Sequence, residues 1–423
     1  MLQVHVLREN RDEFIDRLKK RNHDFTEQID AVLALDEKRR SSQKELDDVL
    51  AEANAMSKEI GQLYQLGKAD EANAIKAKSV ALKQKGQELK DGFALLDEEL
   101  QEALKHIPNV PNPLVPAGST EDDNEIVSEH GSTPDLGENN LPHWELADKY
   151  NLIDFELGVK ITGAGFPVYS GKGAKFQRAL INFFLNEASD AGYSEIIPPL
   201  VVNEASGFGT GQLPDKEGQM YHCEVDDLYL IPTAEVPLTN IYRDVILKDS
   251  DFPVKMTGYT PCFRREAGSY GKDVRGLNRL HQFDKVEIVQ IQHPDKSYET
   301  LDTMVKHVQG LLEKLGLQYR ILRLCGGDLG FTSALTYDME VYSAAQERWL
   351  EVSSISNFET FQANRLKCRF KGSEGKAQLA HTLNGSALAL PRIVAALLEN
   401  NQTTDGIKVP EVLVPYCGFD LIN

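Results

Sequence analysis

The stretch FRREAGSYGKDVRGLNRLHQFDKVE, residues 263–287, decides how the C-terminal part of the chain folds. Its two ends are typical of strands, and the polar, glycine-bearing segment between them is typical of a hairpin loop. Side chains alternate between the two faces of a strand, so Arg264 and Glu266 share one face of the first strand. The residues that share a face of the return strand are Phe283, Lys285 and Glu287.

Such a face could hold a nucleotide and an amino acid. An arginine pairs with phosphate oxygens through two parallel bonds, an aromatic ring can stack on a base, and a carboxylate can bind an ammonium group. Arg279, near the return strand, adds a second arginine to the same side. The other interpretation is an ordinary polar hairpin with surface ion pairs, the commoner role of any one such arginine. The combination of these side chains on one face favours the binding site.

The rest of the C-terminal part mixes strands and helices without regular alternation. The stretches GYSEIIPPLVV, LYLIP, FDKVEIVQIQ, QYRILRL, TYDMEVY and LEVSSIS predict strands. Helices are expected around residues 173–189, 233–246, 297–315 and 386–400. This pattern predicts an α+β fold on a largely antiparallel sheet flanked by helices. Neither a Rossmann glycine motif nor a P-loop is present, since GFPVYSGKG (165–173) has one residue too many between its glycines.

The N-terminal part predicts a long antiparallel coiled-coil hairpin of two helices. Residues 26–107 contain no proline, and Gly67 is a natural helix stop between two apolar seams. The first seam is Leu46, Leu50, Ala53, Ser57, Ile60 and Tyr64. The second is Ile75, Ser79, Leu82, Gly86, Leu89, Phe93, Leu96, Leu100 and Ala103. Nearly 40 residues per helix would reach about 55–60 Å.

Two roles for this hairpin are open, a dimerisation rod and a lever that contacts something distant. Residues 76–90 are rich in lysine, which suits nucleic-acid contact. Folding back about Gly67 also sets them beside the acidic residues 44–59, where salt bridges would neutralise them. Charge alone does not decide between these alternatives.

A proline-rich linker, IPNVPNPLVPAGSTEDDNE, follows the hairpin and cannot continue a helix. We therefore expect two domains, a helical hairpin domain at residues 1–110 and a catalytic domain at residues 111–423.

Composition indicates a globular cytoplasmic protein that does not bind membranes or DNA. Of the 423 residues, 41% are hydrophobic and 26% charged, and no apolar stretch is long enough for a membrane helix. The net charge of −19 argues against coating nucleic acid through a general positive field, although it allows a local patch. The five cysteines form no CxxC pair and no Cys/His cluster, so no zinc site is expected.

The opening stretch resembles the second signature motif of class II aminoacyl-tRNA synthetases, FR-x-E, a loop, and an aromatic residue on the return strand. The whole string is similar to that of the seryl-tRNA synthetase family. So are GTGQLP (209–214), IPTAEVPLTN (231–240), TYDMEV (336–341), EVSSISN (351–357) and HTLNGSALALPR (381–392). With the hairpin and the linker, the resemblance covers essentially the whole chain in order.

The resemblance implies an ATP site with Mg²⁺. Arg264 would hold the α-phosphate, Glu266 the adenine amino group, and Phe283 would stack on adenine. Arg279 and Arg392 would bracket the γ-phosphate and, with Arg264, form the implied catalytic set. The complete implied ATP-binding set is Arg264, Arg265, Glu266, Arg279, Leu280, Phe283, Glu351, Val352, Ser353, Ser354 and Arg392, in which Leu280 would make a backbone contact and Glu351 and Ser354 would hold Mg²⁺.

The resemblance also implies a serine pocket, whose residues would be Thr233, Ala234, Glu235, Arg264, Glu287, Asn384 and Ser386. It places GYSEIIPPLVV (192–202) at a homodimer interface and the hairpin on the long variable arm of tRNA(Ser). Whether tRNA(Sec) is also charged is left open. The implied reaction is serine activation to seryl-adenylate with ATP, followed by transfer of the seryl group to the 3′ end of tRNA.

Alternation does not account for one implied pair. Glu351 and Ser354 have opposite strand parity, so both could meet one metal only through a bulge, a twist or the end of the strand. The chain also departs from the family pattern at Leu335, Tyr342, Ala344 and Asn364, none of which is an implied site residue.

Three other functions are weighed against the implied one. They are an enzyme that loads a carrier protein, a binding protein without activity, and an enzyme specific for threonine. The long hairpin argues against the first and the complete arginine and glutamate set against the second. The absence of a Cys/His zinc cluster and of an editing domain argues against the third.

Overall fold

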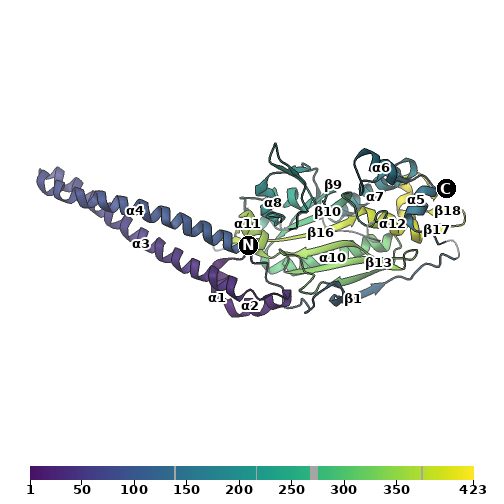
Figure 1. Cartoon of the computed structure of the whole chain (residues 1–423), viewed down its shortest axis with the longest axis horizontal. Coiled ribbons are helices and arrows are strands. Elements are labelled where there is room, and N and C mark those ends of the chain that lie inside the picture. The colour runs from purple at the N-terminus through teal and green to yellow at the C-terminus, as the bar shows by residue number, and fades with distance from the viewer. Residues whose placement is uncertain (138–139, 216, 267–274, 373–374) are drawn as a thin grey trace. The chain divides into compact units, whose positions relative to one another are not determined.

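The computed structural model describes residues 1–137, 140–215, 217–266, 275–372 and 375–423 (Figure 1). The chain divides into two compact units, residues 1–19 with 23–108, and residues 20–22 with 109–423. The division falls two residues before the expected boundary and assigns three residues of the N-terminal segment to the second unit.

The first unit is helical. Two short helices, α1 (Val4–Glu9) and α2 (Arg11–Leu18), precede two long ones, α3 (Thr26–Gln65, 40 residues) and α4 (Ala69–Leu104, 36 residues). The long helices pack side by side along their length, which confirms the predicted hairpin (Figure 1). The chain reverses at Gly67, whose φ of 74° lies in the left-handed region that glycine adopts without strain.

The predicted seam is correct on α4 and partly wrong on α3. All nine predicted positions of α4 are buried or half-buried. On α3, Leu50 and Tyr64 are 45% and 47% exposed, and Ser57 is exposed too. The seam of α3 instead runs through Leu46, Val49, Ala53, Met56, Ile60 and Leu63. The predicted and the observed seam share Leu46, Ala53 and Ile60. Between these residues, α4 packs against Val49, Met56 and Leu63, which are all apolar.

The two edges of the hairpin differ in charge. Lys78 and Lys85 each precede a seam residue of α4 and form ion pairs with Glu52 (3.1 Å) and Glu45 (2.8 Å) on α3. Salt bridges therefore account for one lysine row, as one of the two alternatives supposed.

On the other edge of the hairpin, Lys76, Lys83 and Lys90 each follow a seam residue of α4. We call these three residues the lysine edge. The α3 residues that follow Val49, Met56 and Leu63 of the seam are uncharged, namely Leu50, Ser57 and Tyr64. Within the described parts of the chain, no lysine-edge residue takes part in an ion pair, and all three are exposed.

The second unit is built on an eight-stranded sheet with the order β1-β11-β12-β13-β16-β10-β9-β4. The strands are β1 (Glu125–His130), β4 (Ser194–Glu195), β9 (Val254–Phe263), β10 (Gln282–Gln292), β11 (Tyr319–Arg323), β12 (Leu335–Ser343), β13 (Arg348–Asn357) and β16 (His381–Ala389). Every neighbouring pair is antiparallel except β4 and β9, which confirms the predicted α+β class.

One face of this sheet is covered by three helices, α7 (Gly171–Asp190), α10 (Ser297–Lys314) and α12 (Leu390–Asn400). Val286, Ile288 and Met339 point into the core between the sheet and these helices. The opposite face packs at one end against α9 (Glu235–Asn240) and α11 (Thr360–Leu366), around Val289 and Ile291.

Smaller elements complete the second unit. The helices are α5 (His143–Lys149), α6 (Phe155–Ile161), α8 (Glu204–Thr210) and α13 (Val414–Cys417). The strands are β2 (Ile153–Asp154), β3 (Val168–Tyr169), β5 (Val201–Val202), β6 (His222–Cys223), β7 (Leu228–Leu230), β8 (Ile246–Lys248), β14 (Arg369–Lys371), β15 (Ala377–Leu379), β17 (Gln402–Thr403), β18 (Gly406–Lys408) and β19 (Leu421–Ile422). In the described residues, no helix combines the length and apolar character that crossing a membrane requires.

Three predicted elements differ from the structure. The helix expected at 386–400 begins only at Leu390, because residues 381–389 form the central strand β16. The helix expected at 233–246 is limited to Glu235–Asn240. The expected strand at 192–202 is two short strands, β4 and β5, interrupted by two prolines that cannot donate to a strand ladder.

Candidate active site

The sheet face opposite the three-helix layer carries a line of polar side chains across neighbouring strands. Glu287 of β10 pairs with Ser386 of β16, and Val289 pairs with Asn384. Asn384 is also opposite Ser356 of β13. Because residues directly opposite each other point to the same face, Glu287, Ser386 and Asn384 project from one side of the sheet. The sequence-predicted residues of β10 and β16 are therefore neighbours.

The β9–β10 hairpin adds Arg264 and Phe283 to this face. Phe283 pairs with Cys262, and the backbone NH of Arg264 donates to His281 O at 2.9 Å, which extends the ladder by one residue. The guanidinium carbon of Arg264 lies 5.3 Å from the centre of the Phe283 ring. The cation and the aromatic ring that the sequence assigned to one face thus lie in contact.

Glu266 reaches the same region by a different route from strand alternation. The strand ends at Phe263, and Glu266 has a φ of 48°, so its direction is set by a turn. Its carboxylate receives Arg279 Nε at 2.6 Å. Arg265 diverges from its neighbours, donating its backbone NH to Gln219 O at 2.8 Å. Part of the loop, residues 267–274, lies outside the described residues.

Arg392 projects from the first turn of α12 and is held by backbone oxygens. Its Nε donates to Asn278 O at 3.1 Å and its Nη1 donates to Glu351 O at 2.8 Å. It also lies 3.7 Å from the Glu351 carboxylate. Arg392 and Glu351 therefore lie in contact, and Arg392 is bonded to the residue that precedes Arg279. Leu280, the residue after Arg279, is buried.

A bulge in β13 explains how Glu351 and Ser354 face the same side of the sheet although their spacing gives them opposite strand parity. Asp338 of β12 pairs with Ser354, but Glu340, two residues on, pairs with Glu351. Val352 is the extra residue on β13, so Glu351 and Ser354 face the same way as Asp338 and Glu340. The bulge that alternation required is present, and it turns the Val352 and Ser353 side chains into the interior, at 1% and 2% exposure. Only their backbone groups can meet a ligand on this face.

Electrostatics on this part of the face favour a bound cation. Burial raises the pKa of Asp338 well above its usual range, the nearby Glu351 carboxylate raises it further, and a hydrogen bond from Ser354 opposes the shift. Asp338 Oδ1 is buried without a hydrogen-bond partner in the described residues. The Asp338 and Glu351 carboxylates and the Ser354 hydroxyl make an oxygen-rich setting of the kind that Mg²⁺ takes.

A second cluster, deeper on the same face, is built from buried charged groups. Lys285 Nζ lies 2.6 Å from Glu287 Oε2, and both side chains are almost fully buried. Thr233 Oγ1 donates to the same carboxylate at 3.2 Å and accepts the backbone NH of Glu235 at 3.2 Å. Gln362 Nε2 donates to Glu235 Oε1 at 2.7 Å. The cluster therefore holds two carboxylates and one ammonium group, which leaves one negative charge in excess.

The pKa of Glu235 is raised in this cluster. Burial is the main cause that raises its pKa to about 7, and the neighbouring Glu287 carboxylate adds to the shift, while the Gln362 hydrogen bond opposes it. Ala234, between Thr233 and Glu235, is fully buried and lines the wall. A ligand with an ammonium group would supply the positive charge that this cluster lacks.

Sequence reasoning missed three members of the site. Asp338 and Gln362 carried no signal, because neither lies on the opening hairpin and each is brought in by long-range pairing. Lys285 was placed on the correct face but given no role, although its spacing between Phe283 and Glu287 was the available clue.

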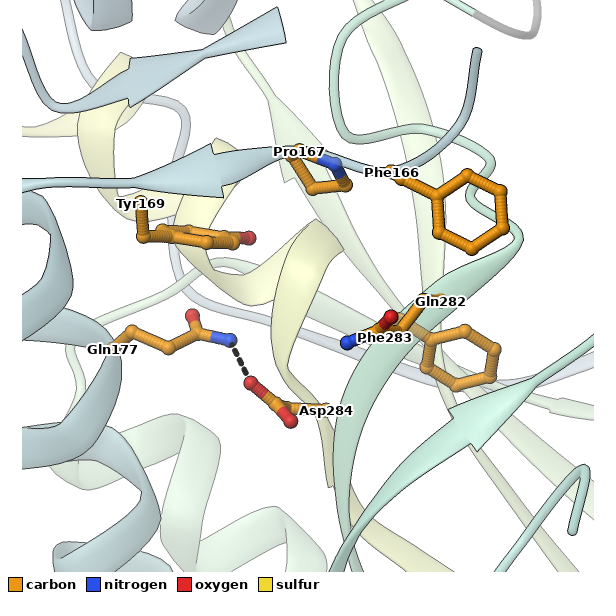
Figure 2. A pocket seen from close by; sticks show the side chains of 7 residues that line it. All are labelled: Phe166, Pro167, Tyr169, Gln177, Gln282, Phe283 and Asp284. Atoms are coloured by element: carbon orange, nitrogen blue, oxygen red, sulfur yellow. Dashed lines mark hydrogen bonds between the residues drawn. The ribbon is translucent and has the colours of Figure 1, made fainter. Parts of the chain in front are cut away.

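A small cavity of about 80 Å³ borders the β9–β10 hairpin and is lined by Phe166, Pro167, Tyr169, Gln177, Gln282, Phe283 and Asp284 (Figure 2). Gln177 of α7 donates to Asp284 at 2.9 Å, as Figure 2 shows, and Tyr259 OH donates to the same carboxylate at 2.9 Å. These bonds tie the back of β10 to α7 and hold the strand segment that carries Phe283. In the parts of the chain that are described, the polar face included, no three His, Cys, Asp or Glu side chains gather closely enough to hold a metal by themselves.

Comparisons with known proteins cover the chain from end to end. Residues 1–111 match the family model described as the seryl-tRNA synthetase N-terminal domain, and residues 221–401 match the tRNA synthetase class II core domain (G, H, P, S and T). A serine–tRNA ligase of Salinibacter ruber is 52% identical over 425 residues, which cover 100% of this chain and 99% of the relative.

Solved structures agree with this match. Seryl-tRNA synthetase from Pyrococcus horikoshii complexed with ATP is similar with a TM-score of 0.93 and 32% identity, over 100% of this chain and 99% of that one. Cytoplasmic serine-tRNA ligase from Naegleria fowleri in complex with AMP gives 0.89 and 27% over the same shares. The similarity thus includes both the hairpin and the sheet that carries the polar face.

Proposed function

The chain belongs to the seryl-tRNA synthetase family, and from this premise we propose that it activates L-serine with ATP and transfers the seryl group to the 3′ end of tRNA(Ser). The observation that carries the proposal is the juxtaposition on one sheet face of a phosphate-binding group and an acid-rich buried pocket. Arg264 and Phe283 form the first, and Glu235 and Glu287 lie in the second.

ATP would lie along the β9–β10 hairpin. Phe283 stacks on the adenine, Glu266 accepts the adenine amino group, and Arg264 neutralises the α-phosphate on which charge grows in the transition state. Arg279 and Arg392 receive the outer phosphates. Support comes from the Arg264–Phe283 contact and from the backbone bonds that aim Arg392 beside Glu351.

Glu351 and Ser354 fit a Mg²⁺ ion that accompanies ATP. The bulge at Val352 brings their oxygens to one side, and Mg²⁺ is usually bound by one or two carboxylates together with substrate phosphates. When bound, the ion would neutralise phosphate charge and fix the bent shape of the triphosphate. Asp338, whose pKa burial and the Glu351 carboxylate raise, would have its negative charge stabilised by such a cation.

The buried cluster would bind serine. Glu287 and Glu235 supply the negative charge that an ammonium group needs, and Thr233, Asn384 and Ser386 surround it with hydrogen-bonding groups. A pocket built to pair a hydroxyl rejects glycine and alanine by up to about 10⁴–10⁵, because its own polar groups would stay unpaired. Threonine must be rejected by steric exclusion.

The reaction then needs positioning more than proton transfer. The serine carboxylate attacks the α-phosphorus in line, pyrophosphate leaves, and seryl-adenylate remains. The terminal ribose hydroxyl of tRNA next attacks the acyl carbon and AMP leaves. We assign no side chain as a general base, and the protein's contribution is alignment and charge neutralisation.

The helical unit would bind the long variable arm of the tRNA, so residues 1–110 form the tRNA-binding domain and residues 111–423 the aminoacylation domain. The lysine edge is the part of the hairpin best suited to phosphate, because its three ammonium groups are exposed and meet no acid across the seam. Charging of tRNA(Sec) would use the same contacts and is tested with that tRNA as a second acceptor.

The active form would be a homodimer joined at residues 192–202. This segment exposes apolar side chains, with Ile197 at 89%, Leu200 at 39% and Val201 at 38%, and adjacent exposed apolar groups mark association surfaces. The cytoplasmic location expected from the sequence stays a prediction.

The test is serine-dependent pyrophosphate exchange into ATP, repeated with each amino acid, followed by charging of tRNA(Ser). We expect exchange with serine alone and charging that depends on ATP and Mg²⁺. Pyrophosphate exchange with threonine in place of serine would mean that the enzyme is specific for threonine. Exchange with serine but no charging of tRNA would favour another acceptor. No exchange with any amino acid would indicate a binding protein.

A further inference from the structure

A buried network outside the polar face ends at the residues that hold Arg392. Its centre is the Glu399 carboxylate, which is fully buried in the last turn of α12. Glu399 Oε1 accepts the backbone NH of His143 (2.8 Å), His143 Nδ1 (2.7 Å) and Gln346 Nε2 (2.9 Å). Ser343 Oγ donates to Oε2. Four donors thus converge on one carboxylate in the interior, an arrangement that fixes every partner in place.

Two of those partners each hold one residue of the segment before Arg279. The backbone NH of Leu277 donates to His143 Nε2 at 2.8 Å, so Nε2 is the acceptor and the ring proton is on Nδ1, directed at Glu399. Asn278 Nδ2 donates to Gln346 Oε1 at 3.0 Å. Consecutive residues of one segment are therefore attached to the same buried carboxylate through two separate side chains.

The segment fits against the imidazole so closely that a side chain is excluded. Gly276 has a φ of 65°, and a Cβ there would lie 2.2 Å from His143 Nε2. On its other side, Asn278 O accepts Arg392 Nε at 3.1 Å. Arg392 and Glu399 belong to the same helix, seven residues apart, which is about two turns. The bonds form a closed circuit from α12 through the segment and back to α12.

From this circuit we propose that His143, Gln346 and Glu399 are positioning residues that fix Arg392 and the neighbouring Arg279 for the outer phosphates of ATP. The proposal rests on the proposed function, because it assumes that the two arginines receive those phosphates. None of the three touches a substrate; each acts through Asn278 or Leu277. The circuit holds the Arg392 guanidinium and the backbone that leads into Arg279 before ATP arrives, which lowers the cost of ordering them on binding.

The test compares binding of ATP with binding of AMP by calorimetry in Gln346→Met. Methionine keeps the length of the side chain but removes the amide group and its hydrogen bonds to Glu399 and Asn278. The Asn278 side chain is then no longer bonded to residue 346. We expect ATP to bind about 10-fold more weakly, as is typical when a supporting hydrogen bond is lost, and AMP and serine to bind as before. AMP lacks the outer phosphates and should not report the change.

Gln292→Met is the matched control. Gln292 is a buried glutamine of this unit, whereas Gln346 is half-buried, and Gln292 Nε2 donates to Thr300 Oγ1 at 2.9 Å at the far end of β10. A purely structural effect of removing a buried amide would lower the melting temperature of both variants and leave the ratio of ATP to AMP affinity unchanged. That unchanged ratio in Gln346→Met would overturn the proposal.

If Gln346→Met is poorly stable, a double-mutant cycle with Arg392→Ala provides a second measurement. If Gln346 acts through Arg392, adding Gln346→Met to Arg392→Ala should change the affinity ratio by less than 2-fold, against about 10-fold in the wild type. Full additivity would contradict the proposal. Failure of the wild-type protein to bind ATP would instead refute the proposed function, so the two failures are distinguishable.

Discussion

Arg264 is the single residue on which the proposed activation of serine depends most. Its guanidinium lies over Phe283 and donates from Nε to Pro232 O, next to Thr233 in the chain, at 3.4 Å. Arg264→Ala should reduce serine-dependent pyrophosphate exchange about 10²–10³-fold, because one donor aimed at transition-state charge is lost. Arg323→Ala is the control, since Arg323 pairs with Glu125 at 2.8 Å on a distant strand pair. Near-normal exchange in Arg264→Ala would remove the assignment.

Glu287 should separate the two substrates. Glu287→Gln keeps the size of the side chain but removes the charge that we assign to the serine ammonium group and that now pairs with Lys285. We expect the KM for serine to rise by about 10-fold or more, the loss of a charge-assisted bond of about 1.5–3 kcal/mol. The KM for ATP should change little. Glu125→Gln, which removes a carboxylate paired with Arg323 on another strand, is the control. A selective loss of ATP affinity in Glu287→Gln would mean that the two binding sites are assigned the wrong way round.

Glu235 predicts how stability depends on pH. Its pKa rises from 4.5 to about 7 in the folded chain, chiefly through burial. Between those values the folded state keeps a proton that the unfolded state has lost, so the stabilisation present at low pH is lost as pH rises through about 7. The melting temperature of the ligand-free wild type should therefore fall relative to Glu235→Gln over that window. Parallel curves for the two proteins would show that Glu235 titrates normally.

At the scale of elements, the helical hairpin allows a matched comparison of two lysine pairs. Lys76 and Lys83 belong to the lysine edge, whereas Lys78 and Lys85 pair with Glu52 and Glu45. Replacing the first pair by alanine should weaken tRNA binding and reduce the slope of log affinity against log salt by about 2. Replacing the second pair should leave that slope unchanged. Equal effects of the two double variants would mean that the edge makes no special contact with phosphate.

The elements also show how far the sequence could predict the fold. The heptad repeat and Gly67 predicted both long helices, because such patterns depend on local spacing. The α3 seam was half wrong because Leu50 and Val49 are both apolar, and only packing against α4 decides between them. The strand β16 was predicted as helix in part, since residues 387–389 are alanine and leucine, which favour helices, and the pairing of β16 with β10 is long-range.

The candidate site was predictable where it follows strand parity. Phe283 and Glu287 alternate on one strand, and Arg264 continues the partner strand, so pattern alone places them together. Glu351 and Ser354 needed a bulge, which no local signal marks. Asp338 and Gln362 come from strands and helices far along the chain, and their roles arise only when the sheet is assembled.

At the scale of the whole molecule, the central claim is a division of labour, with amino acid activation in one unit and tRNA binding in the other. The claim can be tested by shortening the hairpin without disturbing its base. Lys85 pairs with Glu45 across the two helices at 2.8 Å, so the chain can be cut there. Residues 45–85 would be replaced by a Gly/Ser loop of about five residues, a usual length between antiparallel helices.

Shortening should leave Val32, Asp36 and Leu100, which are buried near the base, in place. The most direct measurement is to assay pyrophosphate exchange and tRNA charging in the same shortened protein. We predict exchange within about 3-fold of the wild type and charging reduced about 10²-fold or more, because the lost contacts orient a large substrate. Equal loss of both activities, or equal retention of both, would contradict the division of labour.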